Sequence, residues 1–168
     1  ADLTTEEGRT RVVHAAKAAA GAEGLYGLVN NAGICLPGNV EWLKMKAYEV
    51  SMSLNFFAPV SLTYELLPTI KTARGRVINV TSVDGFIALP TNAAYNASKH
   101  ALEAYSDTLR CEMQPWGVKV VCIEPATMRT PLAVGSDSLA DEIRSKSTSL
   151  ASPQSLYAHE GKPRVVGF

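Results

Sequence analysis

The sequence is poor in cysteine, balanced in charge and free of long apolar runs. Its three cysteines, Cys35, Cys111 and Cys122, form an odd set without metal-ligand spacing, which favours unpaired structural thiols in an intracellular, reducing compartment over a disulfide framework. Sixteen basic residues balance sixteen acidic ones, so no net field attracts nucleic acid or an anionic membrane. No apolar run approaches the roughly 20 residues that cross a bilayer, and the scattered histidines predict no metal site.

A glycine-rich turn between a strand and a helix is also missing. In Rossmann-type domains such a turn opens the helix whose N-terminus receives the pyrophosphate of a dinucleotide. Gly21, Gly24 and Gly27 do not replace it, because no strand precedes them and their spacing is wrong. We interpret them as glycines that end a helix and form a turn.

What the sequence does contain is an alternation of helical and strand patterns typical of one α/β domain. The 46% of hydrophobic residues is ordinary for a globular core. We expect a doubly wound, Rossmann-like parallel sheet covered on both faces. The expected strands are a residual end at Asp2–Thr4, then Leu25–Asn30, Val77–Val80 and Val118–Ile123. The expected helices are Glu6–Ala20, Met45–Leu67 and Ala94–Met113, the last with capping oxygens from Thr91 and Asn92.

One pentapeptide carries acid–base chemistry. In Tyr95-Asn96-Ala97-Ser98-Lys99 the tyrosine and the lysine lie four residues apart, on one face of a helix. A phenol has an ordinary pKa of about 10. A neighbouring ammonium favours the phenolate, so we expect the pKa of Tyr95 to be lowered toward the range of a general base. Ser82 follows an apolar strand, at the sheet edge where ligands of open α/β sheets bind.

Together with Asn30-Asn31-Ala32-Gly33 and Asn55, these residues resemble the short-chain dehydrogenase/reductase family. They match its Asn-Asn-Ala-Gly motif and its Asn-Ser-Tyr-Lys tetrad in order and spacing, over about residues 2–132. The stretches 73–82 and 103–110 are similar to the branch that contains retinol, hydroxysteroid and 3-hydroxybutyrate dehydrogenases. The resemblance implies an NAD(P)-dependent oxidoreductase, with NAD favoured over NADP.

The resemblance assigns a catalytic role to four residues. Tyr95 is the general acid or base, and Ser82 hydrogen-bonds the substrate oxygen. Lys99 lowers the tyrosine pKa and binds the nicotinamide ribose, while Asn55 kinks its helix and holds a water that links Lys99 to solvent. The implied substrate is an apolar secondary or allylic alcohol or its carbonyl partner, such as a retinoid or steroid, with a small hydroxy acid such as 3-hydroxybutyrate as the alternative.

The same resemblance assigns the cofactor contacts, but it does not extend to the C-terminal tail. The implied cofactor-binding residues are Asp2 and Leu3 at the adenine, Asn31, Ala32 and Gly33 at the adenosine, Tyr95 and Lys99 at the ribose, and Met128 and Thr130 at the nicotinamide. Residues 1–148 correspond to a partial Rossmann domain, and 149–168 to a C-terminal tail that does not align with the family. Pairing of the two long helices in relatives implies a homo-oligomer.

By the family comparison, the first two strand–helix units are missing ahead of Asp2, about 60 residues by the usual length of such units. In the strand order 3-2-1-4-5-6, this leaves Leu25–Asn30 as a bare edge that invites aggregation. We therefore expect poor solubility and no tight dinucleotide binding. A catalytically inactive fragment or isoform is the alternative to the enzyme.

Overall fold

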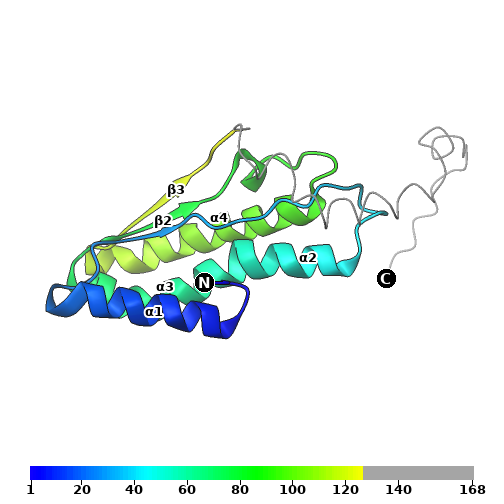
Figure 1. Ribbon diagram of the computed structural model, residues 1–168. Coiled ribbons are helices and arrows are strands. Elements are labelled where there is room, and N and C mark those ends of the chain that lie inside the picture. Colours follow the sequence, from blue (N-terminus) through cyan, green and yellow to red (C-terminus); the bar gives the residue numbers. More distant parts are fainter. Residues whose placement is uncertain (127–168) are drawn as a thin grey trace, which may run out of the picture.

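A computed structural model describes residues 1–126 of the chain (Figure 1). Helices and strands alternate within this part as the sequence predicts. The helices are α1 (Glu6–Ala20), α2 (Met45–Met52), α3 (Ala58–Thr72) and α4 (Ala93–Met113), and the strands are β1 (Gly27–Asn30), β2 (Arg76–Val80) and β3 (Lys119–Ile123). The domain boundary predicted at residue 148 lies outside the described residues.

The three strands form one parallel sheet in the order β1-β2-β3. Val29 of β1 pairs with Ile78 of β2, which pairs with Val121 of β3, so these three side chains share one face. The order agrees with strands 4, 5 and 6 of the doubly wound arrangement. Within the described residues β1 is therefore an edge strand, as predicted, and its Val29 is 57% exposed.

Within residues 1–126 the helices cover a single face of the sheet, so the prediction of two covered faces is wrong for this part. Figure 1 shows α1, α3 and α4 on one side of the strands. Both crossovers, β1 to β2 and β2 to β3, step in the same direction across the sheet, and right-handed crossovers in one direction place their helices on one side. On the other side, Val121 and Ile123 stay 42% and 47% exposed.

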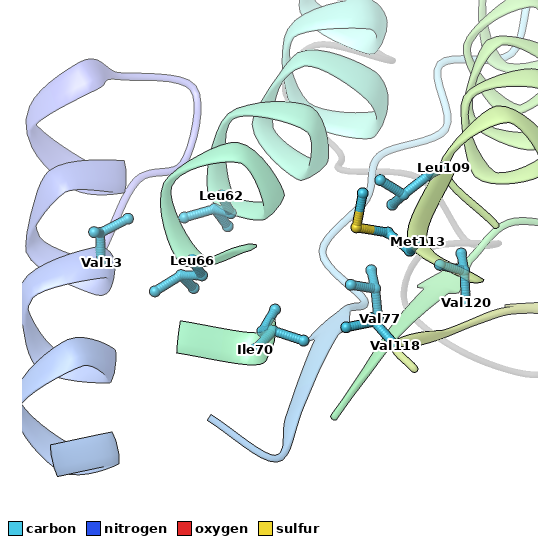
Figure 2. Close-up of a cluster of buried hydrophobic side chains, with 9 residues drawn as sticks. All are labelled: Val13, Leu62, Leu66, Ile70, Val77, Leu109, Met113, Val118 and Val120. Carbon is cyan, nitrogen blue, oxygen red and sulfur yellow. The ribbon is translucent and has the colours of Figure 1, made fainter. Parts of the chain in front are cut away.

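The core lies between the covered face and the helices. Leu62, Leu66 and Ile70 of α3 and Leu109 and Met113 of α4 pack on the strands; Figure 2 shows them with Val13, Val77, Val118 and Val120. Full burial of such a side chain contributes roughly 1.5–3 kcal/mol. This layer fixes α4, and with it the tyrosine helix, against β2 and β3.

The predicted strand end at Asp2–Thr4 is also wrong, because these residues form a turn that leads into α1. The Asp2 carboxylate accepts hydrogen bonds from the N–H and the hydroxyl of Thr4, and its carbonyl accepts the Thr5 N–H. A strand needs a neighbour for its backbone groups. Here the carbonyl and carboxylate of Asp2 instead accept hydrogen bonds from the next residues of the chain, at the start of the helix that Thr5 caps.

The helix predicted over Met45–Leu67 is interrupted and longer than expected. A π-helical turn, Ser53–Phe57, separates α2 from α3, and α3 continues past Pro68 to Thr72. Proline disfavours a helix interior, but the fully buried Ile70 holds the last turn in the core. Packing outweighs the local preference here.

The interpretation of the two glycines that follow α1 is confirmed. Gly21 ends the helix with φ of +54°, and Gly24 ends the next 3₁₀ turn, Gly21–Glu23, with φ of +83°. Side chains are strained at such positive angles. At Gly24 a Cβ would also lie 2.4 Å from the Thr69 carbonyl oxygen, so only glycine fits this turn.

Candidate active site

The four residues of the predicted tetrad lie at the carboxyl end of the sheet and are all buried. Ser82 follows β2 by two residues, Tyr95 lies in the first turn of α4 with Lys99 one turn along, and Asn55 lies in the π-helical turn. Their exposed fractions are 0% for Asn55, 8% for Ser82, 8% for Tyr95 and 3% for Lys99. The structure thus brings together residues from three separate segments.

The Ser82 hydroxyl is close enough to the Tyr95 phenol to affect its pKa. Burial is the largest influence on the Tyr95 phenol and raises its pKa, while the Ser82 hydroxyl lowers it as a hydrogen-bond partner. Ser82 itself is held at the start of a 3₁₀ turn, Val83–Gly85, where its Oγ accepts the Asp84 N–H at 3.2 Å. A substrate oxygen between the two hydroxyls would meet both hydrogen-bond donors.

The expected lowering of the Tyr95 pKa is wrong for this structure. Lys99 Nζ lies 5.5 Å from the centroid of the Tyr95 ring and donates a 2.8 Å hydrogen bond to the Val80 carbonyl. Burial lowers the pKa of Lys99 to about 8. Desolvation disfavours a charge on either side chain, and it is the largest influence on the pKa of each. Tyr95 therefore keeps its proton at neutral pH.

Asn55 uses its whole amide within the protein. Its Oδ1 accepts the Ile34 N–H at 2.8 Å, and its Nδ2 donates to the Ile34 carbonyl and to Ser98 Oγ, each at 2.9 Å. Ser98 Oγ in turn donates to the Tyr95 carbonyl at 2.8 Å. The π-helical turn around Asn55 therefore links the loop after β1 to the first turn of α4.

Gly33 packs directly against this group. A Cβ at Gly33 would lie 3.3 Å from Asn55 Oδ1 and 3.7 Å from Lys99 Nζ. The first distance is tighter than ordinary van der Waals contact. The lack of a side chain at Gly33 thus serves the close approach of this loop to Asn55 and Lys99.

Other predicted cofactor residues lie away from the tetrad or beyond the described residues. Asn31 and Ala32 are exposed just past the carboxyl end of β1. Asp2 and Leu3 lie at the start of α1, where Leu3 packs on the core rather than beside the tetrad. Met128 and Thr130 lie outside residues 1–126.

Asn30, the first residue of the Asn-Asn-Ala-Gly motif, has a structural role in the sheet. Its Nδ2 donates to Asn79 Oδ1 at 2.8 Å and to Thr63 Oγ1 at 3.3 Å. Asn79 Nδ2 then donates to Ser106 Oγ at 2.8 Å. This buried chain of polar side chains joins β1, β2, α3 and α4 just below the site.

Two site residues, Ser98 and Asp84, were missed by the sequence analysis. Ser98 stands inside the pentapeptide, but nothing in the spacing shows that its hydroxyl bridges Asn55 and Tyr95. Asp84 is 5% exposed and accepts a 3.1 Å hydrogen bond from Asn92 Nδ2. The predicted capping role of Asn92 is wrong, because its side chain caps no N–H of α4. The sequence did offer one sign of the role of Asp84, namely an acidic residue two positions after Ser82.

The three cysteines of the chain lie within residues 1–126 and differ in their burial. Cys35 is partly buried near the site, and burial raises the pKa of its thiol to about 11, so it is no nucleophile at neutral pH. All three thiols are unpaired as predicted, but Cys111 is exposed and is no packing residue. Residues 1–126 hold no group of three or more potential metal ligands. None of the helices in that range could cross a membrane.

Comparison with known proteins identifies the family. The short chain dehydrogenase family matches residues 1–139. Retinol dehydrogenase 5 of Mus musculus is 39% identical over 162 residues, which cover 96% of this chain and 50% of that protein. The 17-beta-hydroxysteroid dehydrogenase type 6 of Bos taurus is 40% identical, with coverage of 78% and 41%. The chain thus spans about half the length of the curated relatives it matches.

Solved structures agree with this result. A short-chain dehydrogenase from Streptomyces avermitilis superposes with a TM-score of 0.73 at 34% identity, over 81% of this chain and 49% of that one. An oxidoreductase of the same family from Brucella ovis, in complex with a partially ordered NAD, gives 0.71 at 28% identity, over 93% and 72%. The described residues form part of a Rossmann-like α/β fold, and the chain belongs to the short-chain dehydrogenase/reductase family.

Proposed function

We propose that this chain is the catalytic part of an NAD(P)-dependent oxidoreductase that interconverts an alcohol and its carbonyl partner. The observation that carries the proposal is the convergence of Tyr95, Ser82, Lys99 and Asn55 at the carboxyl end of a parallel sheet, in a chain of this family. Each of these polar side chains is buried. Burial of a polar group without a full set of partners costs free energy, and such groups cluster at functional sites.

The residues present fit the nicotinamide end of a dinucleotide. Lys99 is a buried amine that is held by one backbone carbonyl, which leaves donors free for ribose hydroxyls. Gly33 carries no side chain where the loop faces Lys99 and Asn55. When bound, the cofactor supplies the hydride chemistry, and the protein supplies orientation and proton transfer. We favour NAD over NADP by similarity to the branch.

In this mechanism the chain moves one proton and stabilises one oxygen. Ser82 donates a hydrogen bond to the substrate oxygen and stabilises negative charge as it develops there. Tyr95, which is protonated at neutral pH, donates its proton to that oxygen when a carbonyl is reduced. Oxidation of the alcohol requires the reverse transfer and therefore benefits from a pH at which the phenol ionises more readily.

The relatives support a proposal for the substrate class. Both a retinol dehydrogenase and a hydroxysteroid dehydrogenase match more than three quarters of the chain. We therefore propose an apolar secondary or allylic alcohol, or the matching carbonyl compound, and keep a small hydroxy acid as the alternative. A homo-oligomer through the two long helices and an intracellular location accompany the proposal.

The proposal is tested by replacement of Tyr95 with Phe in the protein that carries this chain. Loss of the phenol oxygen should abolish turnover, by a factor of at least about 10², and leave NAD(H) binding by calorimetry within about threefold. A matched change at an exposed tyrosine, Tyr64→Phe, should leave both unchanged, since that side chain is 75% exposed on α3. Retained activity in Tyr95→Phe would refute the acid–base role.

A second candidate is a chain of the family that neither binds the cofactor nor turns over substrate. The observation that favours it is the uncovered sheet face and the bare edge of β1 within residues 1–126. Isothermal titration with NADH of the protein that carries this chain separates the two. Tight, saturable binding supports the enzyme, and its absence in that protein, when folded, supports the second candidate.

A further inference from the structure

A pair of side chains that the proposed mechanism does not use joins the two segments that carry Ser82 and Tyr95. Asn92 Nδ2 donates a 3.1 Å hydrogen bond to Asp84 Oδ2. Asp84 lies two residues after Ser82, and its N–H is bound to Ser82 Oγ at 3.2 Å. Asn92 comes directly before α4, three residues ahead of Tyr95.

Both members of the pair are tied to their own segments by backbone hydrogen bonds. On one side, the Gly85 N–H donates to the Ser82 carbonyl at 2.9 Å and closes the 3₁₀ turn. On the other side, the Asn96 N–H donates to the Asn92 carbonyl at 2.7 Å and starts α4. A displacement of either side chain therefore moves the backbone that holds a reacting hydroxyl.

The backbone next to Asn92 is strained. Thr91, next to Asn92, has φ of +68°, which is unfavourable for a β-branched residue. Its carbonyl accepts the Gly38 N–H at 2.7 Å, and Gly38 also forms an isolated parallel bridge with Asn92. The loop after β1 thus holds Thr91 in place, and the strained turn aims the Asn92 amide at Asp84.

The chemistry of Asp84 is unusual for a buried acid. It is 5% exposed, and no Lys, Arg or His nitrogen within residues 1–126 lies within 4.0 Å of its carboxylate. An amide N–H donor is its side-chain partner, and a hydrogen bond to a buried charged group is worth roughly 1.5–3 kcal/mol. The charge is also felt at the site, since it contributes to raising the pKa of Tyr95.

We propose that Asp84 and Asn92 are a positioning pair that holds the Ser82 turn against the first turn of α4 and so fixes the approach of Ser82 to Tyr95. The catalytic consequence rests on the proposed function, whereas the positioning itself is a property of the folded chain. The two are therefore measured separately.

The test is an exchange of partners. Asp84→Asn keeps an acceptor, since the introduced amide oxygen can accept the Asn92 N–H. Asn92→Asp sets two carboxylates against each other and breaks the pair. The double variant D84N/N92D restores one amide and one carboxylate in the opposite order. Thr108→Ala, at an exposed hydroxyl of α4 that donates only to the Ala104 carbonyl, is the control.

The readout is amide hydrogen exchange of the folded chain at Gly85 and Asn96, which needs neither cofactor nor turnover. Asn92→Asp should speed exchange at both amides by at least about tenfold, and the double variant should return them to within about threefold of the original chain. Asp84→Asn and Thr108→Ala should change them by less than about threefold. If the double variant exchanges as fast as Asn92→Asp, or if Asn92→Asp has no effect at Gly85, the pair does not position the two segments.

The same variants report on catalysis in the protein that carries this chain. The proposal expects kcat to fall at least about tenfold in Asn92→Asp with the KM for cofactor unchanged, and to recover in D84N/N92D. An equal loss of kcat in the single and double variants would overturn the positioning role. Failure of the proposed function shows itself differently, as unchanged turnover in Tyr95→Phe with the exchange pattern intact.

Discussion

Asn55 binds both backbone groups of Ile34, one with its side-chain oxygen and one with its side-chain nitrogen, at 2.8 and 2.9 Å. A side-chain amide that pairs with a peptide group in this way acts as a short piece of strand. It extends the ordered backbone of the loop after β1 beyond Asn30, where the ladder to β2 ends. The loop is thereby held beside Lys99.

Replacement of Asn55 should reveal this role as a loss of stability. In Asn55→Leu the Ile34 N–H and carbonyl and the Ser98 hydroxyl lose their partner in a site that is fully buried. We expect the free energy of unfolding to fall by roughly 2–4 kcal/mol, since a buried polar group without a partner costs about 1–3 kcal/mol. Urea unfolding followed by circular dichroism measures it. The exposed Asn31→Leu should change it by less than about 0.5 kcal/mol.

Three glycines should differ in their tolerance of alanine, in an order set by the space around a Cβ. At Gly75 it would lie 2.4 Å from the Tyr26 carbonyl oxygen, at Gly33 3.3 Å from Asn55 Oδ1, and at Gly27 3.6 Å from Arg76 Cγ. We expect losses of about 2 kcal/mol or more, about 1 kcal/mol and about zero in that order. Thermal unfolding of the three variants checks the ranking, and a Gly33→Ala variant as unstable as Gly75→Ala would contradict it.

Lys99 should make stability rise with pH between about pH 8 and 10.5. The pKa of this amine is about 8 in the folded chain and 10.5 as its ordinary value. In that window the unfolded chain binds more protons, so the free energy of unfolding increases as pH rises. Below pH 8 the cost of burying the ammonium is present in full. The buried tyrosines, whose pKa values are raised, act in the opposite direction only above pH 10.

The measurement is urea unfolding across this pH range in the original chain, Lys99→Met and the control Lys119→Met, whose side chain is exposed on β3. Lys99→Met should remove the rise, which is at most about 3 kcal/mol for a shift of this size. Lys119→Met should retain it. A rise that survives in Lys99→Met would show that another group causes it.

The edge of β1 should govern self-association of the chain. Val29 is 57% exposed on a strand that pairs on one side only within the described residues. A lysine on an edge strand opposes pairing with a second copy, so Val29→Lys should lower the fraction of aggregate in light scattering and sedimentation. Val40→Lys, at a residue that is 70% exposed outside the sheet, should have little effect. Equal improvement by both changes would indicate general solubility rather than strand pairing.

Periodicity and spacing predict most of the frame and the position of the tetrad. α1 has the predicted bounds, α4 differs by one residue at its start, and the strand order follows from the alternation of elements. The four-residue separation of Tyr95 and Lys99 places both on one face of α4 irrespective of the rest of the fold. Features that depend on local geometry alone are thus accessible from the sequence.

Features that depend on burial could not be predicted from the sequence. The pKa of Tyr95 is raised and that of Lys99 is lowered because desolvation is the largest influence on each, and a sequence does not state how much water is excluded. In the same way, Asn92 is a residue type that often caps helices, but its side chain donates a hydrogen bond to Asp84, which lies in another loop. The extension of α3 past Pro68 likewise follows from the core and not from local propensity.

The hydrogen bond from Lys99 Nζ to the Val80 carbonyl has a partner that every amino acid at position 80 would supply. Side-chain substitution there leaves the acceptor in place. Successive carbonyls of a strand point to opposite sides, however, so a slip of β2 by one residue would withdraw it. Whether the Lys99 amine is hydrogen-bonded therefore depends on the register of β2 against α4. Loss of this hydrogen bond would reveal a slip of the strand even when every residue of the site is unchanged.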